Sequence, residues 1–368
     1  MKITAVDSWY VSIPLRGTFR AGHGARTHQT GIVVRIRTDE GLEGAGNVDP
    51  GVGYSKYSAQ DCHALVQRGL GPALVGRSPE SVRALLARMD QVDPNAREAM
   101  AAVEMALHDL NGKALGVPAH RLLGGAVKDT IFLNGWVGML APEEAAAVAR
   151  DFVERGFRSV KVKVGDGVEP DRDRVAAVRA ACPGLAIRID ANEALDADTS
   201  IALGKAIARY DITLFEQPVP RDDLDGMLRV RKAIDFPVMA DESVEGPESL
   251  IAVIRKECAD IVKVKVMKQG GMLRTVQAIE TADAAGIRCT IGHGFGLTVH
   301  TLAELHTAAA SANLLEACEC VGPLKMTDDV VTEPMTLPRG EVPVPQGPGL
   351  GATLDEAKLA RLAAPLPA

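Results

Sequence analysis

The hexapeptide VKVKVG at residues 160–165 recurs almost unchanged as VKVKV at residues 262–266. Because successive side chains of a β-strand point to opposite faces, the two lysines of each segment share one face. The valines between them point the other way and are typical of a packed surface. Each segment therefore predicts a short strand that presents a pair of ammonium groups on one side.

The two segments belong to a series of short apolar strands along the middle of the chain. Amphipathic, alanine-rich helical stretches separate the eight predicted strands, which are 131–137, 158–164, 185–190, 212–216, 236–241, 259–266, 287–293 and 313–319. The ends of the first seven follow one another at intervals of 24 to 28 residues, which indicates a repeated unit. Strand–helix units of this kind form right-handed crossovers and a parallel sheet. Eight of them predict an α/β fold with a (β/α)₈ barrel of the TIM type, and a doubly wound sheet is the alternative.

The repeated region is flanked by two segments of different texture. Residues 1–125 begin with alternating, strand-like stretches and continue with a long helical pattern, which predicts an α+β capping domain. Residues 126–322 would form the barrel. Residues 323–368 are rich in proline and glycine and do not continue the repeat. We expect them to run back to the first domain and to end in a short helix.

Composition limits the classes of partner. The formal charge is −7, from 41 Lys and Arg against 48 Asp and Glu, and no basic run occurs, so we expect no nucleic acid partner. No apolar stretch approaches the roughly 18–20 residues that span a bilayer, and the first residues lack a secretion-signal pattern. We therefore expect a cytoplasmic protein without membrane contact. The six cysteines are scattered without a CxxC pair, which predicts free, mostly buried thiols.

Acidic residues close three successive predicted strands. Asp190 ends the third strand, Glu216 the fourth and Asp241 the fifth. In a parallel barrel the strand ends meet at one face, where the working side chains collect. Three carboxylates that converge there are tolerated only around a cation. Monodentate oxygen ligands with open positions suit Mg²⁺, with Mn²⁺ as its substitute, so the pattern predicts a divalent metal site.

The lysines acquire a function in this arrangement. Strands two and six stand four apart in an eight-stranded ring, so Lys163 and Lys265 would face each other across the mouth of the barrel. A substrate carboxylate on the metal would present its α-carbon to both amines. Lys161, partial burial and the cation should lower the pKa of Lys163 toward that of a usable base. The pattern predicts removal of a proton α to a carboxylate, with the metal stabilising an enediolate.

These motifs resemble those of the enolase superfamily, and most closely its muconate lactonizing enzyme (muconate cycloisomerase) subgroup. The resemblance covers essentially the whole chain and is carried by KVKVG, IDANE, FEQP, MADES, KVKVMKQGG, ECVGP and GPGLG. It implies a capping domain, a modified (β/α)₈ barrel and a C-terminal segment that returns to the cap. It also implies a small carboxylate as substrate and, because relatives often assemble, a homo-oligomer.

The resemblance assigns roles to individual residues. It implies that Asp190, Glu216 and Asp241 bind Mg²⁺ and that Lys163 and Lys265 are the acid/base pair. It also implies that Lys161 and Glu319 contact the substrate carboxylate. Asn192 and Glu242 would support the site.

Two positions depart from the family pattern. Lys263 stands where relatives often have an uncharged residue, so the site would either hold an extra cation or point it away. His293 ends predicted strand seven, where mandelate racemase-like members pair a catalytic His with an Asp on strand six, but strand six here offers Lys265. We expect His293 to be either a substrate contact or a hydrogen-bonded structural residue, and we expect His108 and His300 to be structural.

The resemblance fixes the first step of the reaction but not its product. An enediolate leads to cycloisomerisation, to racemisation or epimerisation of an amino acid derivative or dipeptide, or to dehydration of a hydroxy acid or hydroxyproline. Two glycine-containing cap loops, 16–30 and 47–59, would close the mouth as lids. Their candidate substrate contacts are Arg20, His23, Arg26, Tyr54 and Lys56. The basic residues favour an anionic second group, so a muconate-type cycloisomerase is the first prediction; a non-catalytic binding protein is disfavoured because no lysine or carboxylate is lost.

Overall fold

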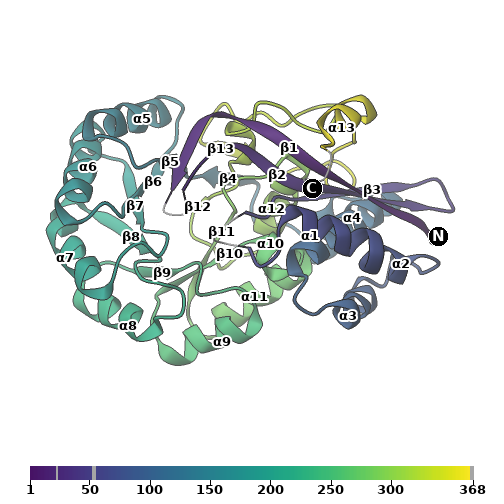
Figure 1. The fold of residues 1–368 in the computed structure, drawn as a ribbon, viewed down its shortest axis with the longest axis horizontal. Helices are drawn as coiled ribbons and strands as arrows, with labels where there is room; N and C mark the ends of the chain where they lie inside the picture. Colours follow the sequence, from purple (N-terminus) through teal and green to yellow (C-terminus); the bar gives the residue numbers. More distant parts are fainter. Residues whose placement is uncertain (22–23, 52–54, 365–368) are drawn as a thin grey trace.

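The computed structural model describes residues 1–21, 24–51 and 55–364, and its elements form two adjoining parts (Figure 1). The N-terminal part is built on an antiparallel sheet of β1 (Ile3–Ala21), β2 (Gly24–Thr38) and β3 (Glu43–Val48). Its helices are α1 (Ala59–Leu65), α2 (Gly71–Leu74), α3 (Val82–Val92) and α4 (Arg97–Leu115). The alanine-rich α4 packs so closely on β3 that a Cβ atom at Gly46 would lie 1.8 Å from the Ala102 carbonyl oxygen.

The segment 16–30 is part of a long hairpin, not the glycine-hinged loop that the sequence suggested. β1 and β2 pair out to Ala21 and Gly24, with a register shift between Pro14 and Phe19. The two strands reach from the capping domain across the barrel (Figure 1). Backbone pairing of the polar residues in this arm explains the difference, because cross-strand hydrogen bonds do not depend on an apolar pattern.

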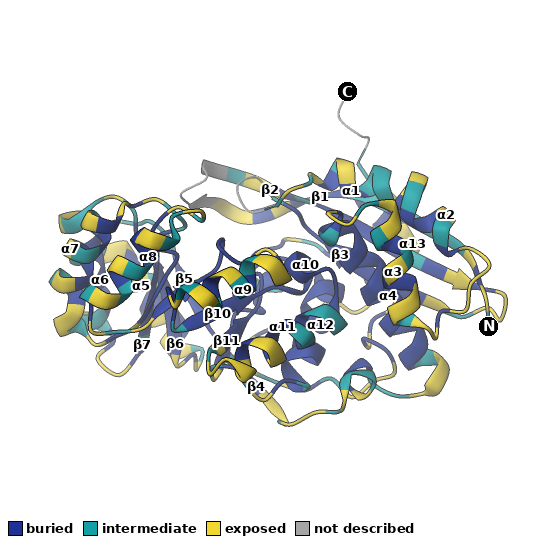
Figure 2. Ribbon diagram, turned by 90° about the horizontal axis from the view of Figure 1, so that it is seen from below, coloured by how far each residue is buried: buried dark blue, intermediate teal, exposed yellow. Residues whose placement is uncertain are grey.

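The second part is the predicted barrel. Its strands are β4 (Thr130–Leu133), β5 (Gly135–Val137), β6 (Ser159–Lys163), β7 (Ala186–Asp190), β8 (Ile212–Glu216), β9 (Val238–Ala240), β10 (Ile261–Val264), β11 (Arg288–Ile291) and β12 (Ala317–Cys318). Its helices are α5 (Pro142–Glu154), α6 (Val168–Ala181), α7 (Ala197–Ile207), α8 (Leu224–Ala233), α9 (Pro247–Lys256), α10 (Val266–Gln269), α11 (Met272–Ala284) and α12 (Thr298–Ala309). Figure 2 shows that the strands are buried and that exposed residues lie on the helices outside them.

Seven parallel strands, from β5 to β11, follow one another in chain order around the barrel. The segment around β12 takes the eighth place, since Leu315 and Glu319 donate backbone hydrogen bonds to carbonyl groups of β11. β12 pairs with β4, while β5 pairs with β6. Asn134 lies between β4 and β5 and donates from its backbone to Cys318, so the ring closes at this residue. The predicted modified (β/α)₈ barrel is therefore confirmed, with a very short eighth strand.

The segment after the barrel returns to the capping domain. β13 (Glu341–Pro343) adds an antiparallel strand to β4, and α13 (Glu356–Leu362) precedes a bridge between Val11 and Ala363. The backbone N–H of Arg16 donates to the carbonyl of Lys325 at 2.8 Å. The predicted domain boundaries at 125/126 and 322/323 remain predictions.

A buried carboxylate of the capping domain caps the N-terminus of one barrel helix. Glu104 on α4 accepts hydrogen bonds from the backbone N–H groups of Met272 and Leu273, at 2.8 and 2.9 Å, at the start of α11. A Cβ atom at Gly271 would lie 2.5 Å from the Glu104 carboxyl carbon, and its φ of +128° also favours glycine. The second glycine of KQGG is thus required by contact with the cap.

All six cysteines are buried free thiols, as the sequence predicted. Within the described ranges, every helix is too short or too polar to cross a membrane.

Candidate active site

The three acidic strand ends meet at one rim of the barrel. Asp190 is the last residue of β7, Glu216 is the last residue of β8, and Asp241 directly follows β9. The parallel register sets Asp190 beside Glu216. At most 1% of each residue is exposed. The fold therefore brings three carboxylates from three neighbouring strands into one buried arc.

Two buried lysines lie between these carboxylates. The Nζ atom of Lys161 lies 3.0 Å from Asp190 Oδ2 and 3.0 Å from Glu216 Oε2. The Nζ atom of Lys263 lies 3.0 Å from Glu216 Oε1 and 4.0 Å from Asp241 Oδ2. Each neighbouring pair of carboxylates thus shares one ammonium group. Of the two orientations that the sequence left open for Lys263, the structure shows the inward one.

Lys163 and Lys265 occupy the two ends of this arc. Lys163 Nζ donates to Asp190 Oδ2 at 2.6 Å and also to Asn192 Oδ1. Lys265 Nζ donates to Asp241 Oδ2 at 2.8 Å. Strands β6 and β10 lie four places apart in the ring, so the two amines approach the site from opposite sides.

Further groups surround the arc. Glu319, next to β12, accepts from Lys161 at 2.6 Å and also from Lys263, and its other oxygen lies 3.9 Å from Arg188. Lys268 on α10 donates to Asp241 Oδ1 at 2.9 Å. Lys268 and Arg188 were not foreseen as site residues, although Lys268 lies within the KVKVMKQGG motif.

The backbone after two of the acidic strand ends is held in an uncommon conformation. Asn192 has φ +43° and Gln217 has φ +34°, in the left-handed region that few non-glycine residues adopt. Asn192 Nδ2 donates to Glu242 Oε1 at 2.9 Å, and Gln217 Oε1 accepts from the backbone N–H of Asp241 at 3.0 Å. Such conformations persist where surrounding contacts enforce them, as at active sites. Gln217 therefore orients the Asp241 backbone, a role that the FEQP motif did not reveal.

Burial and the neighbouring lysines shift the pKa values of the acids in opposite directions. Burial alone would raise the pKa of Asp190 and Asp241, but the neighbouring ammonium groups hold both well below the ordinary value. Burial and the charge of Asp190 raise the pKa of Glu216, the middle acid, to about 8. Burial lowers the pKa of Lys265, yet Asp241 and Glu242 outweigh it and raise the pKa above the ordinary value. The two outer acids are thus held ionised, whereas the middle acid binds a proton more readily.

The donor set fits a divalent metal, although it is not a preformed cage. Within residues 1–21, 24–51 and 55–364, no three acidic, His or Cys side chains already converge as metal ligands, since ammonium groups separate the carboxylates. The chemistry of the donors, three buried carboxylates at one rim, is that preferred by Mg²⁺ and Mn²⁺. Asp190, Glu216 and Asp241 are therefore the residues suited to hold such an ion.

His293 has a carboxylate partner from the capping domain. Asp49, one residue beyond β3, places Oδ2 3.3 Å from His293 Nε2 and Oδ1 3.0 Å from His300 Nδ1. The two imidazole rings stack with centroids 5.6 Å apart. Burial lowers the pKa of His293 to about 4, with Asp49 acting against it, so the ring is neutral at pH 7. The sequence placed Asp49 in a specificity loop but gave no sign of this pairing.

Two further basic side chains, Lys325 and Arg26, lie beside the arc. Lys325 Nζ lies 4.3 Å from the Trp136 ring centroid and 4.2 Å from that of Phe295, and it donates to the Gly294 carbonyl at 2.6 Å. The guanidinium of Arg26, on the hairpin, lies 4.2 Å from the same Phe295 centroid. Burial, followed by the charges of Lys163 and Lys161, lowers the pKa of Lys325 far below its ordinary value. Lys325, Trp136 and Phe295 were missed because no repeat or paired motif marks them.

The remaining predicted loop contacts are only partly placed. His23 and Tyr54 lie outside the described residues, as does the side chain of Arg20, whose backbone pairs with Ala25. Lys56 is exposed, and its backbone N–H donates to Glu98 at 3.0 Å.

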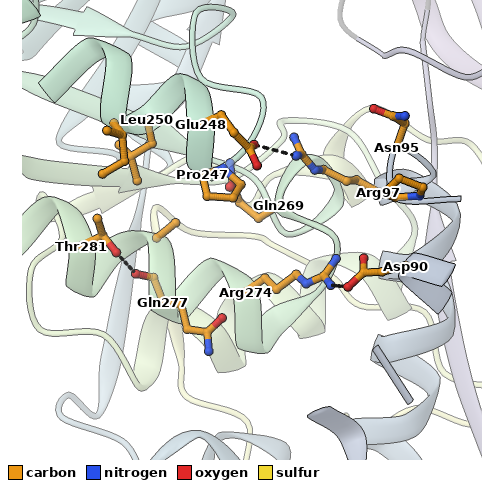
Figure 3. Close-up of a pocket in the computed structure, with 13 residues that line it drawn as sticks. Asp90, Asn95, Arg97, Pro247, Glu248, Leu250, Gln269, Arg274, Gln277 and Thr281 are labelled. Atoms are coloured by element: carbon orange, nitrogen blue, oxygen red, sulfur yellow. Dashed lines mark hydrogen bonds and ion pairs between the residues drawn. The ribbon is translucent and has the colours of Figure 1, made fainter. Parts of the chain in front are cut away.

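A separate pocket of about 600 Å³ lies at the seam between the two parts (Figure 3). Arg97 of the capping domain reaches Glu248 on α9 at 3.1 Å, and Arg274 on α11 reaches Asp90 on α3 at 2.5 Å. The two ion pairs cross the seam in opposite directions, and both join the cap to the barrel.

Comparison with known proteins groups the chain with one family of enzymes. Residues 4–124 match the model of the mandelate racemase / muconate lactonizing enzyme N-terminal domain, and residues 144–358 match that of the enolase C-terminal domain-like family. N-succinyl-L-Arg/Lys racemase of Bacillus cereus is 32% identical over 98% of both chains. Muconate cycloisomerase 1 of Rhodococcus opacus is 33% identical over 96% of both.

A solved structure supports the same grouping. The dipeptide epimerase of Enterococcus faecalis, complexed with Mg and the dipeptide L-Leu-L-Tyr, superposes with a TM-score of 0.92 at 30% identity, covering 96% of this chain and 100% of that one. These relatives are isomerases, and the superfamily is metal-dependent. The chain therefore belongs to the mandelate racemase / muconate lactonizing enzyme family of the enolase superfamily.

Proposed function

We propose that the chain is a muconate-type cycloisomerase, whose reaction passes through an enediolate formed by removal of a proton α to a carboxylate. The observation that supports this most directly is the placement of Lys163 and Lys265 at opposite ends of the acidic arc. Each amine is bonded to a different carboxylate, so each is held in place independently of the other. An amine so positioned, in its neutral form, is a general base for a carbon acid.

The proton and electron movements follow from this placement. In the lactone-opening direction, one lysine takes the α-proton, and the electron pair of the C–H bond passes into the substrate carboxylate. The pair then expels the ring carboxylate from the β-carbon, which gives the diacid. In the closing direction, the carboxylate adds to the β-carbon and the lysine ammonium returns the proton to the α-carbon.

The same arc supports a role for a divalent metal. Asp190, Glu216 and Asp241 would hold Mg²⁺, which when bound supplies positive charge opposite the negative charge that develops on the substrate carboxylate. Lys161 already contacts two of these acids, and Glu319 is anchored by Lys161 and Lys263. These buried side chains are positioned to orient the substrate carboxylate and to exclude water from it.

Two basic side chains near the barrel mouth support a substrate with a second anionic group. Lys325 and Arg26 approach the Phe295 ring, each within 4.2 Å of its centroid. A second carboxylate there would be attracted by the Arg26 guanidinium and would favour protonation of the Lys325 amine, whereas a neutral group would do neither. Muconate carries two carboxylates and meets this requirement.

Racemisation or epimerisation of an N-acylamino acid or dipeptide is the second candidate. Inversion at an α-carbon needs a base on one face and an acid on the other, and two opposed lysines provide both. The relatives named racemase and epimerase are as similar to this chain as those named cycloisomerase.

The deciding experiment compares substrates in D₂O. Enzyme and Mg²⁺ are incubated with cis,cis-muconate, with muconolactone, with a set of N-succinyl amino acids and dipeptides, and with hydroxy acids and hydroxyproline, and the products are analysed by mass and chirality. We expect conversion between muconate and lactone with one α-deuterium incorporated. Inversion of an amino acid derivative would establish the second candidate, and release of water would establish a dehydratase. Absence of α-exchange with every carboxylate would reject the proposed reaction.

We further propose that the protein acts in the cytoplasm as a homo-oligomer. Cell fractionation and light scattering of the purified protein test these two points.

A further inference from the structure

Lys263 is a buried lysine that transfers no proton in the proposed reaction. About 2% of its side chain is exposed, and its Nζ atom donates to Glu216 Oε1 at 3.0 Å and to Glu319 Oε2. The same nitrogen lies 4.0 Å from Asp241 Oδ2. One ammonium group therefore contacts two of the three carboxylates suited to hold a metal.

This position has an electrostatic consequence for any cation bound by the arc. A fixed positive charge 3 to 4 Å from the ligand oxygens repels a divalent cation on those oxygens, and burial weakens the screening of that repulsion by water. The same ammonium group competes for the lone pairs of Glu216. Lys161 exerts a similar effect between Asp190 and Glu216, so Lys263 extends the positive charge to the other half of the arc.

We propose that Lys263 is a positioning residue that lowers the affinity of the Asp190–Glu216–Asp241 arc for divalent cations and holds Glu319 beside Glu216. The bound metal is consequently exchangeable, and its retention depends on the negative charge that an anionic substrate brings. This inference rests on the proposed metal role of the arc, but it does not depend on which carboxylate is the substrate.

The test measures metal binding without substrate. The protein is stripped with a chelator and titrated with Mn²⁺, whose free fraction is followed by electron paramagnetic resonance. We expect Lys263→Met to bind Mn²⁺ about tenfold more tightly than the wild type, because one buried positive charge is removed. Lys263→Arg keeps the charge and is expected to stay within about threefold of the wild type.

A matched control comes from the capping domain. Lys113→Met also removes a lysine bonded to a fully buried carboxylate, Asp109, at 2.6 Å, but that pair lies on α4 and not in the arc. We expect Lys113→Met to leave Mn²⁺ affinity unchanged. Circular dichroism melts show whether each variant is folded.

A second variant covers the case in which Lys263→Met does not fold. The double variant Lys263→Met/Glu319→Gln removes one charge of each sign from a bonded pair, and we expect its Mn²⁺ affinity to stay within about threefold of the wild type. Folded Lys263→Met with unchanged or weaker binding would overturn the proposal, as would a double variant whose affinity falls tenfold, since loss of the Glu319 charge would then not be offset by loss of the Lys263 charge. Failure of the wild type to bind Mn²⁺ would reject the metal site itself, whereas normal binding without α-exchange would reject only the reaction.

Discussion

Strands β6 and β10 carry the same Val-Lys-Val-Lys pattern, yet they place their lysines in different surroundings. Both lysines of β6 lie within the strand, and Lys163 shares its donors between Asp190 and Asn192. β10 ends at Val264, so Lys265 precedes α10, whose Lys268 also bonds Asp241. The alternating pattern puts the two lysines of each segment on one face, whereas the segment that follows each strand determines the partners of its lysines.

Removal of the metal tests both halves of the arc together and should have the largest effect. We expect treatment with a chelator to abolish α-deuterium exchange, because the developing charge on the substrate would lose its counter-charge. Added Mg²⁺ or Mn²⁺ should restore activity. Mass spectrometry of the exchanged carboxylate provides the measurement, and exchange that persists after chelation would contradict the metal assignment.

Replacing one outer lysine at a time separates the two halves. Lys163→Ala and Lys265→Ala should each lower kcat by about 10²- to 10⁴-fold, the usual contribution of a general acid or base. Exchange that survives Lys163→Ala but not Lys265→Ala would show that the β10 side removes the α-proton. Steady-state kinetics and D₂O exchange are measured on the same preparations. Full activity in both variants would remove the basis of the proposed reaction.

The mouth beside β6 should recognise the second carboxylate. Lys325→Met is expected to raise KM for cis,cis-muconate about tenfold, with a smaller effect on kcat, because the amine that would take up a proton and pair with the distal carboxylate is lost. The monomethyl ester of muconate is the control, since its distal group is neutral and its KM should change little. Equal effects on the diacid and the ester would show that Lys325 acts only through packing.

The β10 side of the site contacts the capping domain through His293, which follows neighbouring β11 and lies beside Asp49. The His293 ring should titrate. The pKa of His293, lowered to about 4 by burial against the effect of Asp49, lies below that of an unfolded histidine, near 6.5. Between these pH values only the unfolded state binds the proton, so the free energy of unfolding decreases as pH falls from about 6.5 to 4. This group accounts for a loss of about 3 kcal/mol.

Urea denaturation at several pH values checks this expectation. His293→Gln should retain its stability better than the wild type between pH 6.5 and 4, because it lacks the titrating ring. Lys268→Met would be an unsuitable comparison, since it alters the arc itself. Parallel stability profiles for wild type and His293→Gln would show that the ring is not the titrating group.

The smallest effect is expected at the seam. Arg97→Ala removes a partly exposed ion pair with Glu248, and such pairs contribute about 0.2–1 kcal/mol. The free energy of unfolding, measured in urea, should be lower in the variant by that amount. At high salt the difference between the wild type and the variant should become smaller, because salt screens the ion pair in the wild type. A loss of several kcal/mol would show that this pair carries the attachment of the cap.

The fold was predictable because its repeat is regular. Strand ends such as Lys163, Asp190 and Glu216 lie at the spacing of one strand–helix unit, and the barrel rim then brings them together without further information. The eighth strand shows the limit of this approach, since it consists of two residues and is completed by Asn134 at the junction of β4 and β5.

Contacts between distant segments could not be predicted in the same way. Asp49 and His300 are 251 residues apart and belong to different domains, so no local pattern records their pairing. The sequence did not decide whether Lys263 points into the site. Alternation predicts the strand face on which a side chain lies, but it does not identify the acceptors, on other strands, that stabilise a buried charge. Lys325 follows the last barrel strand, β12, so the strand–helix repeat could not be used to predict its position.

The hydrogen bonds from α11 to Glu104 make the start of one barrel helix dependent on the capping domain. A barrel produced alone would leave the amides of Met272 and Leu273 without their acceptor, directly beyond the helix that carries Lys268. Exchange of capping domains between relatives by recombination would therefore succeed only where the incoming domain offers a carboxylate at the same place.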